Sequence, residues 1–524
     1  MQEVATPPRT TSPSVSVKST TVETPTHLLG WLPTLWTHVL FAGSTPPATV
    51  LRAAPLAAIV VVSGLLLYPC MAFPLFEPDE GRYAQIPREM LTAGEWIVPT
   101  LQGGPYLDKP PLFYWLVMLS YTLFGYHDWA ARLIPALSMQ GTVLLIYLLG
   151  RRMVGERSAC WGALLLTVSP IFLGVGRLLV LDGVLTFWIT LALLAAYLGQ
   201  ADTRLKTGWW CAAAIACGLG VLTKGPVAMV LTLIPLWTQR RLVASAPISW
   251  RGWLGFGMVV VAINLPWYTA VCWQRPEFVR YFLWQHNVER FVEPFDHVRP
   301  VWFYVPILLF GLLPTLSFAR PLWRFLTSTN AAESQQRCPA LGYLLLAGTW
   351  CVFFFSLAGS KLPTYILPAF PPFCLALGCF VARTDWHRSR WMIGATVGCW
   401  LLLACSHYVV IPKYARERSS MNACSACVEN VPVICFPRNV DSVAFYVGRS
   451  DFQSYRSKDI DALVRALEQQ PRTIVLFGHR NSPETLKLHL PPHLRMVERR
   501  PMGLCEMAVI VRQAPGVIAI ADTR

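Results

Sequence analysis

The chain has 524 residues, of which 54% are hydrophobic and only 14% are charged. Soluble globular domains carry about 25% charged residues, and the apolar residues here gather in runs of roughly 15 to 25, the length of a membrane span. This composition excludes an ordinary soluble protein. The formal charge of +15 does not indicate nucleic-acid binding, because the basic residues lie in short loops between apolar runs, where they set membrane topology.

The first 50 residues are predicted to form a disordered or interfacial cytoplasmic segment. Residues 1–30 are rich in Ser, Thr and Pro and lack the apolar core of a signal peptide. The run Trp31–Ala42 is apolar but too short to span a bilayer, so we expect it to lie on the membrane interface.

Residues 51–412 are predicted to form an all-α polytopic membrane bundle of about 11 to 13 transmembrane helices. Basic loops such as Arg151–Arg152 and Arg240–Arg241 alternate with loops of a different kind, and the positive-inside rule assigns the basic loops to the cytoplasm. The predicted spans are residues 51–74, 131–150, 158–176, 183–200, 208–223, 226–239, 252–273, 301–319, 339–357, 362–382 and 389–412.

One apolar run, Pro110–Phe124, breaks this alternation. If it crossed the membrane, every later loop would invert, and its roughly 15 residues fall short of the ~20 that a span needs. We therefore predict a helix that dips into or lies along the outer leaflet, with the prolines in its first turn. A short true span, with one further crossing elsewhere, is the alternative.

The outer loop 75–130 concentrates the charged residues of this weakly charged chain, in the stretch FEPDEGRYAQIPREMLTAGEWIVPTLQGGPYLDKPP from Phe76 to Pro111. Ionisable groups beside a bilayer are costly to desolvate, so this cluster indicates a functional site. Asp79 and Glu80 could stabilise positive charge at a sugar carbon or deprotonate a hydroxyl. The alternative is a structural loop held by salt bridges to Arg82 and Lys109.

Two single lysines, Lys109 and Lys224, lie at the outer ends of apolar helices beside proline or glycine. Each could simply extend to the interface or could hold a lipid phosphate as a point charge. Together with Arg290 and Lys361, they favour an anion site at the depth of the lipid headgroups.

Other polar residues of the outer loops have two interpretations each. Asp182 could cap the helix 183–200 or contact substrate, and Tyr365 could bind a phosphate oxygen or belong to the interfacial aromatic belt. His286 lies between aromatic residues, where a packed histidine is more common than a ligand. Asp108 and His286 could share a divalent metal ion, but two ligands are too few to establish a site.

Residues 413–524 are predicted to form a small soluble α/β domain outside the membrane. Apolar strands are expected at 431–436, 473–477 and 508–511, and a helix at 460–467. The C-x2-C pair Cys424–Cys427, with Cys435 and Cys505 nearby, favours a disulfide in an oxidising compartment over a zinc site.

The motifs of residues 50–410 together resemble the bacterial GT-C glycosyltransferases. The nearest resemblance is to the aminoarabinose lipid A transferase group, which is related to the protein O-mannosyltransferases. This family transfers a sugar from an undecaprenyl or dolichyl phosphate on the outer face of the membrane. The motifs are DEGRYAQIPREM, DKPPLFYWL, RLLVLDG, TKGP, HNVERF and SKLPTYILPAFP.

The resemblance also implies roles for individual residues. It makes Asp79 the catalytic carboxylate, with Glu80 beside it, and Asp182 a second functional aspartate. It places a possible divalent metal ion on Asp108 and His286, although many relatives have Glu in place of Asp108. The implied contacts to the donor phosphate are Lys109, Lys224, Arg290 and Tyr365, with Arg82 and Tyr83 next to them.

The expected protein is thus an enzyme of the bacterial inner membrane, with its active site and α/β domain on the periplasmic side. Its expected partners are a polyprenyl-phosphate sugar, membrane lipids, and lipid A or another glycolipid or protein as acceptor. Three alternatives remain: transfer to Ser or Thr, transport of a lipid-linked sugar, and a scaffold that binds through the α/β domain. Transport is disfavoured because it needs polar groups at the membrane midplane, whereas the charges here gather at one face.

Overall fold

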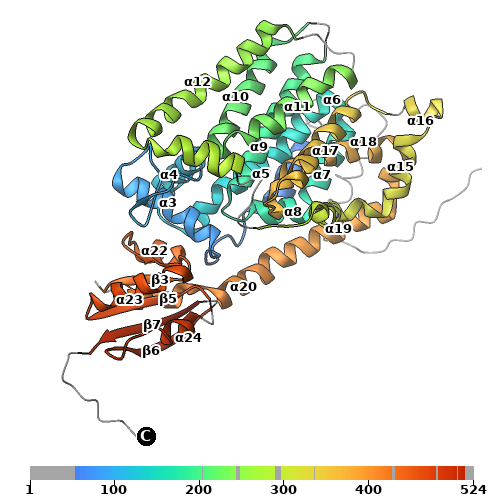
Figure 1. Ribbon diagram of the computed structural model, residues 1–524. Coiled ribbons are helices and arrows are strands. Elements are labelled where there is room, and N and C mark those ends of the chain that lie inside the picture. Colours follow the sequence, from blue (N-terminus) through green and yellow to red (C-terminus); the bar gives the residue numbers. More distant parts are fainter. Residues whose placement is uncertain are drawn as a thin grey trace, which may run out of the picture. The chain divides into compact units, whose positions relative to one another are not determined.

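The computed structural model describes residues 54–202, 204–242, 248–289, 297–335, 337–427, 431–479, 482–503 and 505–513. The predicted segment 1–50 and the candidate phosphate ligand Arg290 lie outside these residues. One compact unit extends from Pro55 to Arg524 and contains a helical bundle followed by an α/β part (Figure 1).

The bundle consists of apolar helices that follow the predicted runs closely. Its first half contains α2 (Ala54–Leu67), α3 (Asp79–Ala93), α4 (Leu112–Phe124), α5 (Asp128–Leu148), α6 (Gly150–Val154), α7 (Glu156–Thr167), α8 (Pro170–Gly176), α9 (Leu181–Gln200), α10 (Thr207–Lys224), α11 (Val227–Leu242) and α12 (Trp250–Gln274). A short hairpin, β1 (Thr100–Leu101) and β2 (Gly104–Pro105), follows α3.

The second half of the bundle is more irregular. It contains the π-helix η1 (Val279–Glu289), η2 (Val301–Phe303), α14 (Tyr304–Gly311), η3 (Leu313–Phe318), α15 (Ala319–Thr327), α16 (Ala331–Gln335), α17 (Leu341–Leu357), η4 (Pro363–Ala369), α18 (Phe370–Arg383), η5 (Asp385–Arg388), α19 (Arg390–Cys405), η6 (Ser406–Val410) and α20 (Ile411–Arg418).

The chain is a membrane protein by the length and composition of its helices. Within the described residues, five helical segments are long and apolar enough to cross a bilayer: Asp128–Val154, Leu181–Gln200, Trp250–Gln274, Pro363–Arg383 and Arg390–Arg418. The shorter apolar helices α2, α11 and α17 overlap further predicted spans, whereas the predicted span 301–319 is divided into η2, α14 and η3.

One predicted span, 158–176, is broken into α7 and α8, which are inclined at 66°. Ser169 and Pro170 explain the break. Proline lacks the backbone N–H that would continue α7, and the Ser169 hydroxyl caps the new helix by accepting a hydrogen bond from the N–H of Phe172.

The run that the sequence predicts to lie along the outer leaflet forms a helix, α4, of 13 residues. At 1.5 Å per residue this helix is about 20 Å long, which is shorter than the ~30 Å hydrocarbon core of a bilayer. It packs against α3 and α5. Its length therefore agrees with a helix that does not cross, while its depth in the membrane stays a prediction.

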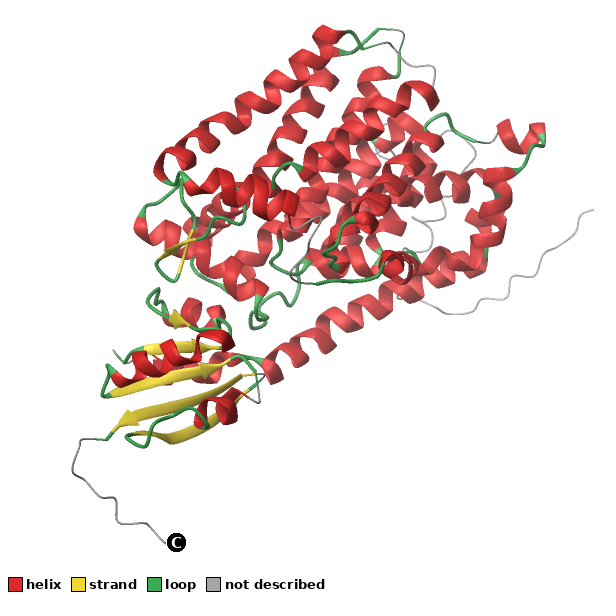
Figure 2. Ribbon diagram, viewed as in Figure 1, coloured by secondary structure: helices red, strands yellow, loops and turns green. Residues whose placement is uncertain are grey.

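The α/β part is built on a five-stranded sheet with the order β4-β3-β5-β7-β6, drawn in yellow in Figure 2. β3 pairs in parallel with β4 and β5, and β7 pairs antiparallel with β5 and β6. The elements are η7 (Ser420–Ala423), α21 (Cys424–Cys427), β3 (Val433–Phe436), α22 (Asp441–Val447), β4 (Gln453–Ser454), η8 (Ser457–Asp459), α23 (Ile460–Glu468), β5 (Arg472–Phe477), α24 (Ser482–Lys487), β6 (Leu494–Met502) and β7 (Cys505–Arg512).

The disulfide expected among the C-terminal cysteines is wrong for this structure, in which Cys424, Cys427, Cys435 and Cys505 are all free thiols. Cys424 and Cys427 are the two ends of one short helix, α21. Helical residues three apart have Cβ atoms about 5–6 Å apart, whereas a disulfide requires about 3.5–4.5 Å. In this structure the two thiols stand unbonded at opposite ends of α21.

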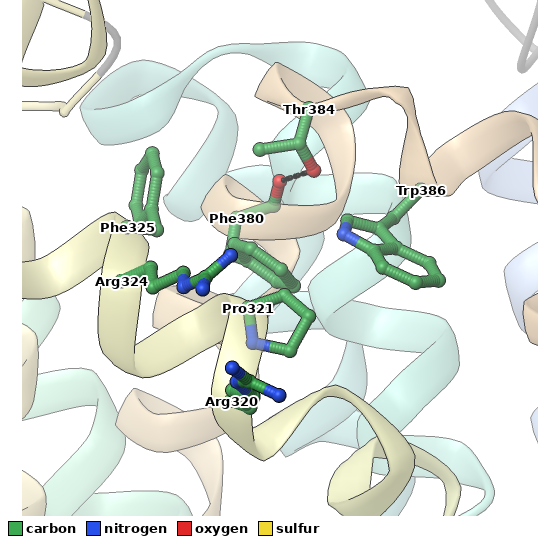
Figure 3. Close-up of a pocket in the computed structure, with 7 residues that line it drawn as sticks. All are labelled: Arg320, Pro321, Arg324, Phe325, Phe380, Thr384 and Trp386. Carbon is green, nitrogen blue, oxygen red and sulfur yellow. Dashed lines mark hydrogen bonds between the residues drawn. The ribbon is translucent and has the colours of Figure 1, made fainter.

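A pocket of about 400 Å³ lies at the C-terminal end of α18, where α15 and η5 meet it (Figure 3). Two arginines of α15 line it, and the Thr384 hydroxyl donates to the Phe380 carbonyl beside it. No predicted site residue contributes. Its lining is Arg320, Pro321, Arg324, Phe325, Phe380, Thr384 and Trp386.

Candidate active site

The first part of the site joins three elements that are far apart in the sequence. Lys224, the last residue of α10, donates a hydrogen bond of 2.5 Å to Asp182 in the first turn of α9. The two side chains are only 13% and 11% exposed. The Lys224 ammonium also lies 4.5 Å from the centre of the Tyr365 ring in η4, a distance at which a cation interacts with an aromatic face.

Asp182 does not cap its helix, so the capping interpretation of this residue is wrong. The N-cap of α9 is Val180, which makes no side-chain capping bond, and the Asp182 carboxylate instead binds Lys224. The two partners are 42 residues apart in sequence, and the antiparallel packing of α9 and α10 brings them together.

A second group of polar side chains surrounds the end of the loop that follows β2. Asp108 accepts a hydrogen bond of 2.5 Å from the Tyr281 hydroxyl, and Lys109 Nζ lies 2.7 Å from His286 Nε2. Burial raises the pKa of Asp108, but the Tyr281 hydrogen bond and the positive charges of His286 and Lys109 outweigh it and hold the pKa below its ordinary value.

A third group comes from the first turns of α3. Asp79 is 55% exposed and lies 3.8 Å from the guanidinium of Arg82, which is 28% exposed. Arg82 also lies over the Tyr106 ring at 6.0 Å. Tyr83, the next residue, packs edge-on against Phe113 of α4. Asp79 is thus the carboxylate of this group that is open to solvent.

Tyr83 connects the three groups. Burial raises the pKa of its phenol, and the negative charges of Asp79, Asp182 and Asp108 raise it further, while Arg82 lowers it. Charges act on one another over several ångströms, so these effects place the three carboxylates in the wider surroundings of this phenol. The charges of Asp79, Asp182 and Asp108 thus all act on the phenol of Tyr83, which keeps its proton.

Glu80, predicted beside Asp79 as catalytic, is only 2% exposed and is fully engaged in hydrogen bonds. Arg132 of α5 donates to both of its oxygens, at 2.8 and 2.6 Å. The backbone N–H groups of Leu179 and Phe76 donate to the same carboxylate. This geometry gives Glu80 the role of fixing three segments of chain behind the site.

Lys361 is also held away from the solvent. Its ammonium donates to the carbonyls of Arg299, at 3.1 Å, and Ala358, and it is 4% exposed. Burial lowers its pKa. Lys361 thus closes the C-terminal end of α17, rather than adding to the cations that line the site.

Asp108 and His286 do not form a metal site here. The described part of the chain contains no group of three or more His, Cys, Asp or Glu side chains placed to hold a metal ion. The Lys109 ammonium faces the His286 nitrogen that would bind a metal. The Tyr281 hydroxyl donates a hydrogen bond to the Asp108 carboxylate oxygen that would be the other ligand. A cation beside the ligand atoms opposes a second cation, so these residues do not fit a divalent metal ion.

Sequence reasoning missed Tyr281 and Arg132 as parts of this arrangement. Tyr281 lies five residues before His286 in the π-helix η1, so its position in an already suspected loop was a usable signal. Arg132 is a charged residue near the start of an apolar helix, and it is fully buried. An arginine at such a position requires an anionic partner, although the sequence does not say which one.

Comparisons with known proteins agree with this fold. Residues 53–282 match the family of dolichyl-phosphate-mannose-protein mannosyltransferases. The undecaprenyl phosphate-alpha-4-amino-4-deoxy-L-arabinose arabinosyl transferase of Edwardsiella ictaluri is 37% identical over 62% of this chain and 59% of its own length. The protein of the same description from Shewanella sediminis is 32% identical over 68% of this chain and 66% of its own length.

The crystal structure of ArnT from Cupriavidus metallidurans bound to undecaprenyl phosphate has the same fold, with a TM-score of 0.70. It is 20% identical and the superposition covers 88% of this chain and 98% of that one. By sequence, the chain spans about 59% of the length of the Edwardsiella relative. The chain therefore has the GT-C fold and is related to the undecaprenyl phosphate-aminoarabinose arabinosyl transferases and, with them, to the protein O-mannosyltransferases.

Proposed function

We propose that the chain is an integral membrane glycosyltransferase that moves a sugar from a polyprenyl phosphate to an acceptor at the membrane surface, with inversion at the anomeric carbon. The observation that carries the proposal is the Asp182–Lys224 ion pair, whose ammonium lies over the Tyr365 ring. The exposed Asp79 carboxylate beside Arg82 adds a second pair of opposite charges. A site that combines carboxylates and cations suits a reaction in which a phosphate leaves and a sugar carbon becomes positive.

The donor phosphate would meet the cations of the site. Lys224 and Tyr365 offer an ammonium and a hydroxyl at the ends of α10 and η4, and Arg82 offers a guanidinium from α3. These groups stabilise the negative charge that grows on the leaving lipid phosphate. Apolar surfaces of the neighbouring helices suit the polyprenyl tail.

Asp79 is the carboxylate best placed to meet the acceptor, because it is the exposed one. The acceptor oxygen attacks the anomeric carbon as the bond from that carbon to the phosphate oxygen breaks, and the lipid phosphate departs with the electron pair. A lipid A phosphate is already ionised, so Asp79 would orient it or stabilise the sugar cation. A hydroxyl acceptor would instead lose its proton to Asp79.

The relatives indicate the substrates to test first. The proteins from Edwardsiella and Shewanella are described as aminoarabinose transferases that use undecaprenyl phosphate. We infer an aminoarabinose-type pentose or a hexose as the sugar, lipid A or another glycolipid as the acceptor, and the bacterial inner membrane as the location. The site and the α/β part would then face the periplasm.

Transfer to Ser or Thr of a protein is the second candidate. It is favoured by the match of residues 53–282 to the protein mannosyltransferase family. The two reactions differ in what Asp79 must do, because only a neutral hydroxyl needs a base. Replacing Asp79 by Asn should therefore abolish sugar transfer to a protein hydroxyl. Sugar transfer to a phosphate acceptor should be slower but still measurable.

The decisive experiment supplies purified full-length protein with undecaprenyl phosphate-aminoarabinose and lipid A, and measures product by mass spectrometry. The expected product is lipid A heavier by one aminoarabinose, with a rate that falls by at least about 100-fold in Asp79→Asn. Asp461→Asn, an exposed substitution in α23, is the matched control and should be unchanged. Full turnover by Asp79→Asn would overturn the assignment.

A further inference from the structure

The α/β part meets the candidate site through the start of α22, which lies against α3 (Figure 1). Glu77 Oε1 accepts a hydrogen bond of 2.6 Å from the backbone N–H of Ser442. The N-cap of α22, Val440, makes no side-chain capping bond, so Glu77 satisfies one of the free N–H groups at the start of this helix. A carboxylate from the bundle thus completes a helix of the α/β part.

Gly81 makes this close approach possible. A Cβ atom at position 81 would lie 2.6 Å from the Ser442 nitrogen and 2.8 Å from Glu77 Oε1. Any other residue at this position would separate α3 from α22. The glycine of the DEGR motif is therefore explained by the contact with the α/β part.

Asp441 brings a second carboxyl group to the same place. It is 1% exposed, and Gln102 of the loop between β1 and β2 donates to its Oδ1 at 3.2 Å. The remaining oxygens, Glu77 Oε2 and Asp441 Oδ2, are buried and have no hydrogen-bond partner among the described residues. Two neighbouring buried carboxyls cannot both ionise at low cost, and one proton held between them would give both oxygens a partner.

The titratable groups that face this pair come from three elements. α3 contributes Arg82 and Glu89, β3 contributes Cys435, and β7 contributes Cys505. Arg82 is the cation that favours the charged form of both carboxyls. The same guanidinium lies 3.8 Å from Asp79, so it is shared between the pair and the candidate catalytic carboxylate.

Burial raises the pKa of Glu77 to about 8, and the charge of Asp441 contributes, while the Ser442 hydrogen bond and Arg82 act against the rise. Burial likewise raises the pKa of Asp441. The pair therefore holds a proton at neutral pH and carries one negative charge rather than two. The loss of that proton would place a second negative charge beside Arg82.

We propose that Asp441 and Glu77 share one proton and act as positioning residues, which hold Arg82 in place beside Asp79 and make the α/β part a working part of the site. The inference rests on the proposed glycosyl transfer for its effect on turnover. The docking of α22 on α3 is independent of that reaction, so the two can be tested separately. A second negative charge on the pair would draw Arg82 away from Asp79 and slow transfer.

The first test measures docking without any substrate. Hydrogen–deuterium exchange of residues 441–447 is followed from pH 5 to 9 in the full-length protein, as a protection factor corrected for the intrinsic exchange rate. Glu77 binds its proton more tightly when α22 is docked, so docking is strongest at low pH. Protection should fall by up to about tenfold per pH unit between the ordinary pKa of 4.5 and about 8, and then level off.

Glu77→Gln and Asp441→Asn are the informative variants, and Asp461→Asn is the control. In both pair variants the fall in protection between pH 5 and 8 should flatten, because the shared proton is gone, whereas the control should follow the native curve. The proposal of a shared proton would be overturned if protection in the native protein did not depend on pH. It would also be overturned if the two pair variants kept the native pH dependence.

The second test measures transfer. Native turnover should decline above pH 8, and Asp441→Asn should lose this alkaline decline, because the pair can then carry only one negative charge at any pH. The KM for the donor should change little. A purely structural role would lower the melting temperature and leave the pH profile unchanged, which would overturn the positioning role. If the native protein shows no transfer, the proposed reaction is wrong. The hydrogen-exchange data still show whether Glu77 and Asp441 share a proton.

Discussion

Asp79 and Glu80 are neighbours in sequence but lie in different environments. Successive side chains of a helix point about 100° apart, so α3 turns Asp79 toward solvent and Glu80 toward Arg132. Both were candidates in the sequence because both are acidic residues beside a span. Only the position of Arg132, 52 residues later, separates a carboxylate that can meet substrate from one that holds the fold.

This difference predicts opposite effects of two substitutions. Arg132→Met leaves the Glu80 carboxylate buried without its cation, and the loss of one partner of a buried pair costs about 3–5 kcal/mol of stability. Asp79→Asn removes an exposed charge and should change stability by about 0.5 kcal/mol or less while it suppresses transfer. Thermal unfolding in detergent and the transfer assay check both. Equal melting temperatures would contradict the structural role of Glu80.

The Asp182–Lys224 pair predicts changes of opposite sign in phosphate binding. Lys224→Met removes a charged donor and should weaken binding of undecaprenyl phosphate by about 1.5–3 kcal/mol, or roughly 10- to 100-fold. Asp182→Asn releases Lys224 from its carboxylate and should tighten phosphate binding while turnover falls. Titration of detergent-solubilised protein with undecaprenyl phosphate measures both, with exposed Lys458→Met as the control. Weaker binding in Asp182→Asn would contradict this account.

The Lys109–His286 contact predicts that transfer does not depend on a divalent metal. An ammonium group 2.7 Å from His286 Nε2 occupies the direction from which a metal would bind. Prolonged treatment with EDTA should leave the rate unchanged, and the purified protein should contain no stoichiometric zinc or manganese by elemental analysis. Loss of activity upon chelation, with recovery upon addition of one metal, would show that Lys109 moves aside.

At the level of elements, the sequence predicted the long apolar helices well, because 15 or more apolar residues have few alternatives in a bilayer. It missed the break at Pro170, where local capping by Ser169 divides one apolar run. It also missed β6, whose residues Leu494–Met502 are mostly charged or exposed. Such an edge strand is defined by its pairing with β7, not by its own hydrophobic pattern.

The candidate site was predictable in part for the same reason. Charges in an apolar chain stand out, so Asp79, Lys109, Asp182 and Lys224 could be selected from the sequence. The contact of Glu77 with Ser442 spans 365 residues, and nothing local indicates it. The carboxyl pair is therefore a property of tertiary packing and required the structure.

Gly81 gives a prediction at the scale of one helix against another. In an isolated helix, alanine is more favourable than glycine by about 1 kcal/mol. At position 81 the added methyl would meet the Ser442 nitrogen at 2.6 Å, and overpacking typically costs about 1–3 kcal/mol. Gly81→Ala should therefore lower hydrogen-exchange protection of α22 despite its better helix propensity.

The control for this substitution is Gly257→Ala in α12, where an added Cβ meets no atom within 4 Å. It should leave the exchange of α22 unchanged. If Gly81→Ala also left that exchange unchanged, α22 could be concluded to dock without the close contact. That outcome would also weaken the case for the shared proton.

At the scale of the whole molecule, the span from Pro363 to Arg383 separates two regions of different character. It has 21 residues, or about 31 Å of helix, enough to cross the hydrocarbon core. Tyr365 of the candidate site lies at its start, and Arg383 and the pocket with Arg320 and Arg324 lie at its end. This arrangement predicts that the site and the basic pocket lie at opposite membrane faces.

Reporter fusions test this arrangement. Truncation after Arg388, just past the basic end of α18, should give a fluorescent green fluorescent protein fusion and an inactive alkaline phosphatase fusion, because both report a cytoplasmic end. Fusion after Gln513, beyond the further span Arg390–Arg418, should give the reverse result and place the α/β part with the site. The same reporter pattern at both positions would mean that Arg390–Arg418 does not cross. The α/β part would then lie on the opposite face from Tyr365, and Asp441 could not reach Arg82.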